Sequence, residues 1–284
     1  MPFAWILNLD AELELSQPRY QASAAIRRRL EEHAQRAQGL LGAGDITIDV
    51  LEANASMDAS AFKARAWCPT RSAQARAAAR GIELEPAPEL SIIERVNHRL
   101  FAHQLGGGLP GQRYVTQPAE LDEVLAGAQW PLLFKRPFSF AGRGQQRLYR
   151  APTAPEAAWL AASIRTGGMI VEPLVQPIVE FSQHGWIEAH GQTRYGAPCV
   201  QSVSDRGVFQ AARRATSADL RVHEQHALTE RLDAVAVALR RAGYFGPFGI
   251  DAYRYDSRGR VGFCALSEIN ARYTLSYPTG FSRA

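Results

Sequence analysis

The sequence predicts an α/β protein with more than one lobe, and three patterns along its 284 residues support this fold class. Short apolar segments alternate with helical patterns in residues 1–90, which is typical of a small parallel α/β lobe. A series of strand patterns separated by turns follows Gly168, which is typical of an antiparallel sheet. The stretch from Tyr244 to Thr274 has the pattern of a long β-hairpin. The length is sufficient for two or three lobes with a substantial core.

The composition is that of an ordinary globular protein, with 46% hydrophobic and 21% charged residues. No run of about 18 apolar residues occurs, and the first residues lack the basic region of a signal peptide. We therefore expect a cytoplasmic protein without membrane contact. Cys68, Cys199 and Cys264 are widely spaced, which predicts reduced thiols and no zinc site. The net charge of +4 comes without a basic stripe, so nucleic acid is not an expected partner.

Residues 1–90 form the predicted N-terminal lobe. Strands are expected at Phe3–Leu9, Ile46–Leu51 and Gly81–Leu84, and helices from Pro18 to about Leu41 and from Ser72 to Arg80. We assign this lobe no chemistry of its own.

Residues 91–172 form the predicted linker helix and lid lobe. A helix is expected over Ser91–Leu105, and the strand Pro131–Lys135 ends in a cation just before the glycine-rich segment Ser139–Gly144. Backbone N–H groups of such a turn can approach phosphate closely. The alternative is a lysine at a strand end followed by an ordinary turn. A P-loop and a Rossmann fingerprint are both excluded because their glycine and lysine spacings do not occur.

Residues 173–284 form the predicted C-terminal lobe. Strands are expected at Phe181–Ile187, Thr193–Val203 and Val208–Arg213, followed by a long helix over Glu224–Arg241. Four histidines stand in separated polar contexts and are expected at the surface: His184, His190, His223 and His226.

The hairpin carries the strongest chemical signal of the chain. If Asp256 pairs with Val261 across the turn, Asp251 lies opposite Leu266 and Glu268 one diagonal step further, with backbones roughly 7–8 Å apart. Because side chains alternate along a strand, Asp251, Glu268 and Asn270 share a face, which suits a common Mg²⁺. The alternative is a solvated sheet face with incidental acids.

The pattern G-x-D followed by E-I-N-x-R resembles the last strands of the ATP-grasp fold. The resemblance implies that Asp251, Glu268 and Asn270 hold one or two Mg²⁺ ions, or Mn²⁺, against the phosphates of ATP. It also implies that Arg272 meets phosphate or an acyl phosphate. Ala271 stands where the family often has proline.

Other segments resemble the same family. The stretch Asn97–Pro110 is similar to the segment before the lid, with Arg99 where the family has a lysine near the α-phosphate or adenine. The resemblance further implies that Lys135 contacts the α- and β-phosphates and that the lid loop, with Ser139, Gly142 and Gly144, covers the γ-phosphate. It implies that Arg213, preferred to Arg214, also contacts the γ-phosphate. Glu172 and Val175 would lie at the adenine edge, and Glu180 at the ribose.

The family implies an ADP-forming carboxylate–amine ligase that works through an acyl phosphate, with a small carboxylate and a small amine, such as an amino acid or peptide, as substrates. A homodimer is a possible assembly. Two alternatives stay open: an ATP-grasp phosphotransferase and a non-catalytic nucleotide-binding module. Catalysis would rest on positioning and charge neutralisation.

Three energetic expectations follow. Repulsion between the two carboxylates should raise the pKa of at least one of them. Asp251→Asn and Glu268→Gln should then raise the melting temperature or leave it unchanged. Lys135→Ala should leave it nearly unchanged, because an exposed cation contributes little to stability.

Overall fold

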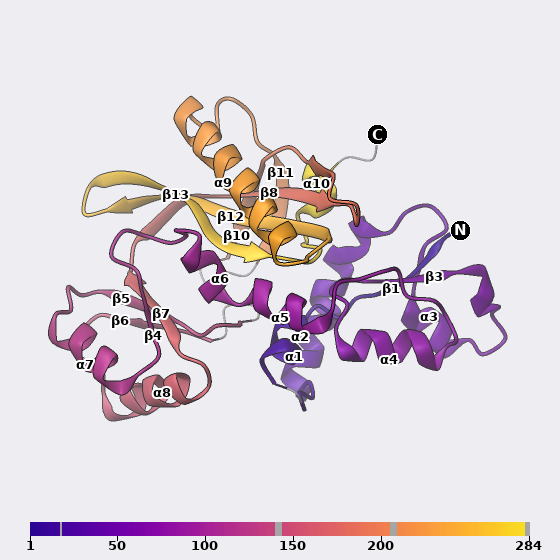
Figure 1. Ribbon diagram of the computed structural model, residues 1–284, viewed down its shortest axis with the longest axis horizontal. Helices are drawn as coiled ribbons and strands as arrows, with labels where there is room; N and C mark the ends of the chain where they lie inside the picture. Colours follow the sequence, from indigo (N-terminus) through magenta and orange to yellow (C-terminus); the bar gives the residue numbers. More distant parts are fainter. Residues whose placement is uncertain (18, 140–143, 205–208, 282–284) are drawn as a thin grey trace.

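The computed structural model describes residues 1–17, 19–139, 144–204 and 209–281, and it contains three β-sheets, each in its own lobe (Figure 1). The N-terminal lobe lies on the right of Figure 1, the lid lobe at the lower left, and the C-terminal lobe above and between them. Over the described residues, no helix combines the length and the apolar character needed to cross a membrane.

The N-terminal lobe is the predicted parallel α/β unit. Its sheet has the order β2-β1-β3, and both neighbours run parallel to β1. The strands are β1 (Phe3–Ile6), β2 (Ile46–Thr47) and β3 (Lys63–Ala66), and the helices are α1 (Ala11–Ser16), α2 (Ala24–Ala37), α3 (Ile48–Ala53) and α4 (Arg71–Ala79), with short 3-10 helices at Gln38–Leu40 and Ala59–Ala61.

Two predictions for this lobe were wrong. The segment Ile46–Leu51 is a strand only over its first two residues, after which α3 begins. Ile48 and Leu51 are fully buried while their neighbours Asp49 and Val50 are exposed, a spacing of three that fits a helix face. The predicted strand at Gly81–Leu84 is reduced to a single bridge between Leu84 and Ala64.

The lid lobe is a four-stranded antiparallel sheet with two helices. Its order is β4-β7-β5-β6. The elements are β4 (Arg113–Val115), α7 (Pro118–Ala126), β5 (Leu132–Lys135), β6 (Gln145–Leu148), α8 (Ala154–Arg165) and β7 (Met169–Pro173). Phe134, Leu148, Leu160 and Met169 form its core.

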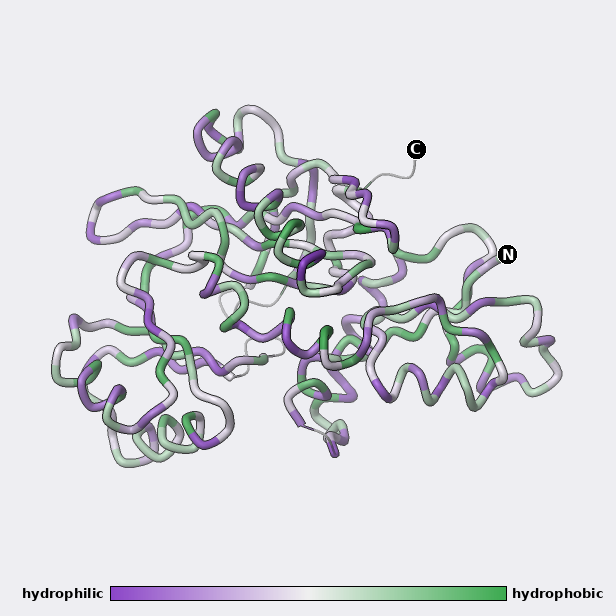
Figure 2. The backbone as a smooth tube through the Cα atoms, in the orientation of Figure 1, coloured by the Kyte–Doolittle hydropathy of each residue, from purple (hydrophilic) through white to green (hydrophobic). Residues whose placement is uncertain are grey.

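The C-terminal lobe is the predicted antiparallel sheet. Its order is β11-β10-β8-β12-β13, and β9 pairs with β8. The elements are β8 (Gln176–Ile187), β9 (Thr193–Tyr195), β10 (Cys199–Val203), β11 (Phe209–Arg214), α9 (Val222–Arg241), β12 (Gly246–Ser257), β13 (Arg260–Asn270) and α10 (Tyr277–Gly280). Purple and green alternate along α9 in Figure 2, as expected for a helix with one apolar face.

The two faces of this sheet have different roles. Phe181 of β8 and Ile250 of β12 belong to the apolar core that includes Leu228 and Leu232 of α9. Asp251 pairs with Ser182 across the same two strands, so it points to the opposite face. The helix therefore leaves one face of the sheet for polar side chains.

The helix predicted over Ser91–Leu105 is interrupted. It consists of α5 (Leu90–Asn97) and α6 (Arg99–Gln104), separated by His98 in an extended conformation. The imidazole Nδ1 of His98 accepts a hydrogen bond from the N–H of Leu100 at 3.1 Å and so caps α6. Val96 and Ala102 pack into the core of the C-terminal lobe. The interruption places Arg99 at the first position of α6.

The hairpin has the predicted turn and a different register beyond it. Asp256 pairs with Val261 as expected, but Asp251 lies directly opposite Glu268 and not opposite Leu266. The ladder is irregular between Asp251 and Tyr253, because the step from Tyr253 to Asp251 on β12 faces the longer step from Cys264 to Glu268 on β13. The shift is even, so both carboxylates keep the same face.

Candidate functional site

Asp251 and Glu268 form the centre of the candidate site, and their carboxyl groups differ in protonation. Asp251 accepts hydrogen bonds from Asn270 Nδ2 at 2.8 Å and from Gln201 Nε2 at 3.1 Å. Burial, followed by the negative charge of Glu268, raises the pKa of Asp251 to about 7 in spite of these bonds. The expected rise of one carboxyl pKa is therefore present, with burial as its larger cause.

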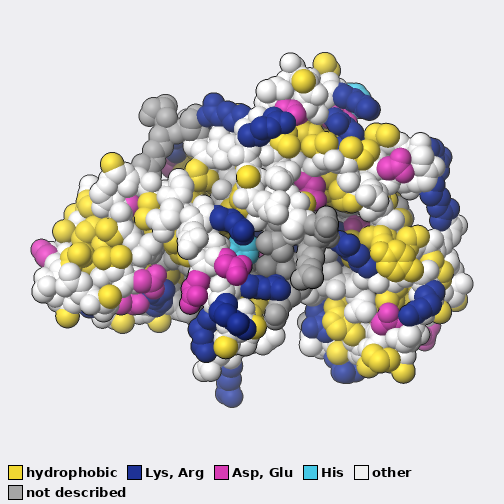
Figure 3. Space-filling view, turned by 180° about the vertical axis from the view of Figure 1, so that it is seen from behind, with side chains coloured by type: hydrophobic (Ala, Val, Ile, Leu, Met, Phe, Trp, Pro, Cys, Tyr) yellow, Lys and Arg dark blue, Asp and Glu magenta, His cyan; other side chains and the backbone are white. Residues whose placement is uncertain are grey.

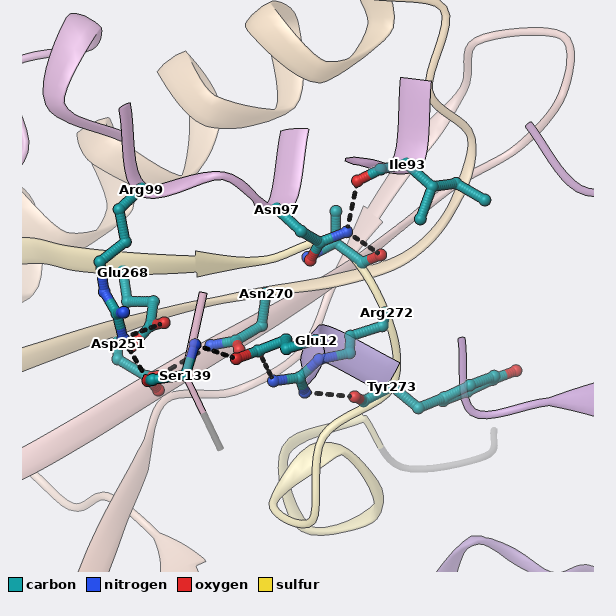
Figure 4. A network of polar contacts seen from close by, with 11 residues as sticks. Glu12, Ile93, Asn97, Arg99, Ser139, Asp251, Glu268, Asn270, Arg272 and Tyr273 are labelled. Carbon is teal, nitrogen blue, oxygen red and sulfur yellow. Dashed lines mark hydrogen bonds and ion pairs between the residues drawn. The ribbon is translucent and has the colours of Figure 1, made fainter. Parts of the chain in front are cut away.

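Glu268 has the opposite shift. Burial acts to raise the pKa of Glu268, but the positive charges of Arg99, Lys135 and Arg272 outweigh it and hold the pKa below its usual value. Arg99 Nη2 donates to Glu268 Oε1 at 2.8 Å (Figure 4). One carboxyl group of the pair is thus compensated by cations and the other is not.

Arg99 lies inside this cluster, with only 6% of its surface exposed. Its guanidinium also donates to the backbone oxygen of Arg136 at 2.6 Å and to Ser139 Oγ at 2.8 Å. Arg99 therefore connects the hairpin that carries Glu268 to the segment that leads into the lid loop.

Lys135 is buried and not exposed, contrary to the expectation above. Its Nζ lies 2.5 Å from Glu172 Oε1, and the two residues are 8% and 2% exposed. Lys135 ends β5 and Glu172 lies on the adjacent strand β7. Burial raises the pKa of Glu180, although the charge of Lys135 acts to lower it. The lysine therefore lies between two carboxyl groups that are predicted to line the nucleotide site.

Arg272 contacts a residue that the sequence did not indicate. Its Nη2 pairs with the carboxylate of Glu12 in α1, and its Nη1 donates to the backbone oxygen of Tyr273 at 3.0 Å. Gln201 is a second site residue without a sequence signal. The signal that could have identified Glu12 is its position just beyond the carboxyl end of β1, the edge at which α/β sheets bind ligands.

Arg213 is not brought to the cluster. It pairs with Val200, which packs toward the α9 side of the sheet, and its guanidinium is exposed and bound to Asp219 at 2.5 and 2.7 Å. Arg214 pairs with Cys199, which pairs with Ser182, so Arg214 lies on the face of Asp251. The alternation along β11 thus favours Arg214 over Arg213.

The remaining predicted residues belong to the lid loop and to the segment that follows β7. Gly142 lies outside the described residues. Gly144 has a φ of +81°, and a Cβ there would lie 3.1 Å from the backbone oxygen of Phe138, so this position needs glycine. Val175 lines a cavity of about 220 Å³ together with Pro173 and Tyr255. A larger cavity of about 1150 Å³, between α5, α6 and α9, contains none of the predicted site residues.

His184 was expected at the surface and is fully buried. Its Nε2 lies 2.9 Å from Thr274 Oγ1 and 3.1 Å from Ser276 Oγ, and burial lowers its pKa to about 3. His184 pairs with Gly249, so it lies on the polar face of the sheet beside the site. The other three histidines named above are exposed, as predicted.

Among the residues that the structure describes, carboxyl groups outnumber cations at the site. Three cations, Lys135, Arg99 and Arg272, stand against five carboxyl groups: Glu12, Glu172, Glu180, Asp251 and Glu268. No cluster of three or more His, Cys, Asp or Glu side chains with metal-binding geometry occurs in the described part of the chain. Two carboxylates and the Asn270 amide nevertheless suit Mg²⁺, which is usually bound by one or two protein carboxylates together with substrate phosphates.

Figure 3 shows a hollow between the lid lobe and the rest of the molecule, seen from behind, with Lys and Arg side chains in dark blue at its edges. Figure 4 shows Glu12, Arg272, Ser139, Arg99 and Glu268 as one connected set of polar contacts that comes from all three lobes.

No protein-family model matches the chain, and no curated protein sequence is similar to it. Solved structures are similar. An N5-carboxyaminoimidazole synthetase from Staphylococcus aureus, solved with ADP, matches over 96% of this chain and 71% of its own, with a TM-score of 0.54 and 12% identity. A biotin carboxylase from Campylobacter jejuni, solved as a β-γ-ATP complex, matches over 84% and 57%, with a TM-score of 0.58 and 12% identity. A pyruvate carboxylase from Rhizobium etli matches over 82% and 20%, with a TM-score of 0.59 and 17% identity.

The chain spans about half of the length of several matched proteins, between 51% and 57% of their chains. At these identities the similarity concerns the fold. The chain has a parallel sheet, a small antiparallel sheet and a larger antiparallel sheet, and its fold matches that of these structures, as the resemblance to the ATP-grasp fold predicted.

Proposed function

We propose that the chain is an ATP- and Mg²⁺-dependent ligase that joins a small carboxylate to a small amine and releases ADP and phosphate. The observation that carries the proposal is the pair Asp251 and Glu268, opposite each other in a buried site beside Lys135, Arg99 and Arg272. Five carboxyl groups against three cations make a site that favours added positive charge.

The proposed reaction needs no protein nucleophile. A substrate carboxylate oxygen attacks the γ-phosphorus of ATP, the bond to the bridging oxygen breaks, and ADP leaves. The nitrogen of a neutral amine then attacks the acyl carbon of the acyl phosphate, the C–O bond to phosphate breaks, and the nitrogen loses a proton. Such phosphoryl transfer depends on positioning and on charge neutralisation.

The residues take the following proposed roles. Asp251, Glu268 and Asn270 would hold Mg²⁺, which neutralises phosphate oxygens when bound. Lys135 and Arg99 would contact the phosphates, and Arg272 the transferred phosphoryl group. The segments at Ser139 and Gly144, with Gly142 between them, would cover the phosphates, while the backbone at Glu172 and Val175 would meet the adenine and Glu180 the ribose.

The similar structures support the nucleotide part of this proposal. The Staphylococcus aureus synthetase was solved with ADP, and a biotin carboxylase domain from Hydrogenobacter thermophilus was solved with MgADP and bicarbonate. Amino acids or peptides as substrates, a homodimer and a cytoplasmic location remain predictions.

Two measurements test the function. Calorimetry with MgADP should show binding, and a mass-spectrometric screen of carboxylate and amine pairs should show ADP only when both substrates are present. ADP formation with a single phosphorylated acceptor would favour the phosphotransferase. Asp251→Asn should abolish turnover, whereas Asp256→Asn, at the turn of the same hairpin, should not. Absence of any nucleotide binding would contradict the proposal.

A further inference from the structure

Glu12 is a buried carboxylate that the N-terminal lobe extends toward the candidate site. It stands in the first turn of α1, just beyond β1, and only 8% of the residue is exposed. Its neighbours Ala11 and Leu15 pack into the core between the lobes, which fixes the helix. In Figure 4 the carboxylate lies beside the guanidinium of Arg272.

Both groups that Glu12 contacts come from other lobes. Arg272 Nη2 pairs with Glu12 Oε1, and the backbone N–H of Ser139 points to Glu12 Oε2 at 3.4 Å. These residues lie 260 and 127 positions away along the chain. A guanidinium and a backbone N–H that converge on one carboxylate are the donors that proteins use to bind carboxylate or phosphate ligands.

The surroundings of this carboxylate suit an anion. Ser139 Oγ accepts from Arg99 Nη2, which places a second guanidinium beside the same segment. The Arg272 guanidinium uses two of its hydrogen-bond donor nitrogens, one for Glu12 and one for the backbone oxygen of Tyr273. One N–H of Arg272 Nη2 is therefore engaged by Glu12 in this structure.

We propose that Arg272 and the N–H of Ser139 form an anion subsite, and that Glu12 occupies it as an internal ligand which a substrate anion displaces. The inference rests on the proposed function and specifies it further. The ligand is a carboxylate or phosphoryl oxygen group, either the substrate carboxylate or the γ-phosphate of the nucleotide. Binding of ligand in the cleft thus competes with the contact that ties the N-terminal lobe to the other two lobes.

Glu14 offers a matched control on the same helix. Its carboxylate accepts from Thr70 Oγ1 at 2.6 Å and from the N–H and Oγ of Ser72 at 2.8 and 2.6 Å. All of these partners belong to the N-terminal lobe. Glu14→Gln therefore removes a bonded carboxylate from α1 without changing the charge beside Arg272.

The test compares the full chain with Glu12→Gln, Glu14→Gln and Glu12→Gln/Arg272→Gln by calorimetry. The probes are MgADP, the Mg²⁺ complex of β,γ-imido-ATP, and inorganic phosphate or acetate added to the MgADP complex. Glu12→Gln removes the competing negative charge, so it should tighten binding of the anion that enters the subsite by about tenfold. If the γ-phosphate is the ligand, the gain appears for β,γ-imido-ATP and not for MgADP. If the substrate carboxylate is the ligand, the gain appears for acetate.

Glu14→Gln should change none of these affinities, and the double variant should lose the gain. Equal or weaker anion binding by Glu12→Gln, in a protein that still binds MgADP, overturns the subsite and leaves the proposed function intact. An unaltered chain that binds neither nucleotide contradicts the proposed function itself. Thermal unfolding of each variant shows that it is folded.

Discussion

Lys135 illustrates how burial changes the role of a single residue. A lysine at a strand end is usually solvated, but this one lies between two strands and 2.5 Å from the buried carboxylate of Glu172. Sequence patterns indicate that a strand ends in a cation, yet they do not show which neighbouring strand will pair with it. The partner Glu172 follows from the sheet order β7-β5, which depends on the folded lobe.

Lys135→Ala should therefore destabilise the protein, because it leaves Glu172 charged and unpaired. Breaking one side of a buried pair typically costs about 3–5 kcal/mol. Urea unfolding at pH 7 measures the loss. Glu172→Gln in the same chain should recover part of it. The exposed pair Lys63–Glu83, at 3.4 Å, serves as a control, since Lys63→Ala should cost at most about 1 kcal/mol. Equal effects at both positions would contradict the buried pair.

Neutralising Asp251 and neutralising Glu268 should have opposite effects on the stability of the fold. The sequence predicted the same effect for both, a melting temperature that rises or stays unchanged. The raised pKa of Asp251 means that the folded state holds its proton between pH 3.8 and about 7, so ionisation destabilises the fold as pH rises through this range. Asp251→Asn should thus gain stability relative to the unaltered chain from pH 4 to 7, and keep the gain above pH 7.

Glu268→Gln should instead lower the melting temperature at pH 7, because the lowered pKa of Glu268 shows that its charge is stabilised by Arg99 and other cations. Calorimetric melting at several pH values checks both variants. Parallel shifts of the two variants would show that the carboxyl groups share one environment.

His184 should make the fold sensitive to acid. Its pKa of about 3 in the folded state lies below the usual 6.5, so the unfolded state takes up a proton first as pH falls. The stability that His184 contributes should decrease below pH 6.5 by about 1.4 kcal/mol per pH unit. The difference in unfolding free energy between the unaltered chain and His184→Gln should follow this slope.

At the scale of elements, the junction between α5 and β13 explains a departure from the family pattern. The backbone N–H of Ala271 donates to Asn97 Oδ1 at 2.9 Å, and the backbone oxygen of Ala271 accepts from Asn97 Nδ2 at 3.3 Å. Proline at this position would lack the N–H. The two contacts also fix the distance between the segments that carry Arg99 and Arg272.

Ala271→Pro should accordingly destabilise the chain by about 1–3 kcal/mol, because it leaves a buried acceptor of Asn97 without its donor. In the Asn97→Ala background, Ala271→Pro should cost less, because the N–H of Ala271 has already lost its acceptor, Asn97 Oδ1. Denaturant unfolding of the four proteins of this double-mutant cycle measures the coupling. Purely additive losses of stability would show that the hydrogen bonds between Asn97 and Ala271 do not hold α5 to β13.

Elements with a strong periodic pattern were predictable, whereas elements set by their contacts were not. The hairpin turn and α9 follow from turn residues and from apolar spacing in the sequence. Helix α3 was mistaken for a strand because ITIDVL contains β-branched residues at positions where burial favours a helix. The interruption at His98 depends on the cap that its own side chain provides.

At the scale of the whole molecule, the site combines residues that local patterns cannot relate. Asp251, Glu268 and Asn270 belong to one hairpin, and the sequence was sufficient to place them on one face. Glu12 and Gln201 joined them only through packing between distant segments. Arg213 was misplaced because the side that β11 presents is set by its register with β10.

The charge balance of the assembled site leads to the last prediction. The five carboxyl groups disfavour binding of the nucleotide alone. Binding of Mg²⁺ alone is disfavoured because the raised pKa of Asp251 keeps this carboxyl group partly protonated near neutral pH. Together, nucleotide and metal neutralise each other, so MgADP should stabilise the fold more than the sum of ADP and Mg²⁺ added separately. A ligand at 100 times its Kd adds about 2.7 kcal/mol.

Thermal unfolding at pH 8 with ADP, Mg²⁺, both, or both plus a chelator measures this synergy. Mn²⁺ should replace Mg²⁺. Asp251→Asn should reduce the synergy because it removes one proposed carboxylate ligand. Asp256→Asn should retain it because the Asp256 carboxylate accepts a hydrogen bond from the N–H of Gly259 within the turn. Additive shifts in the unaltered chain would place the metal away from the hairpin, and the opposed carboxylates would then serve the fold and not the nucleotide.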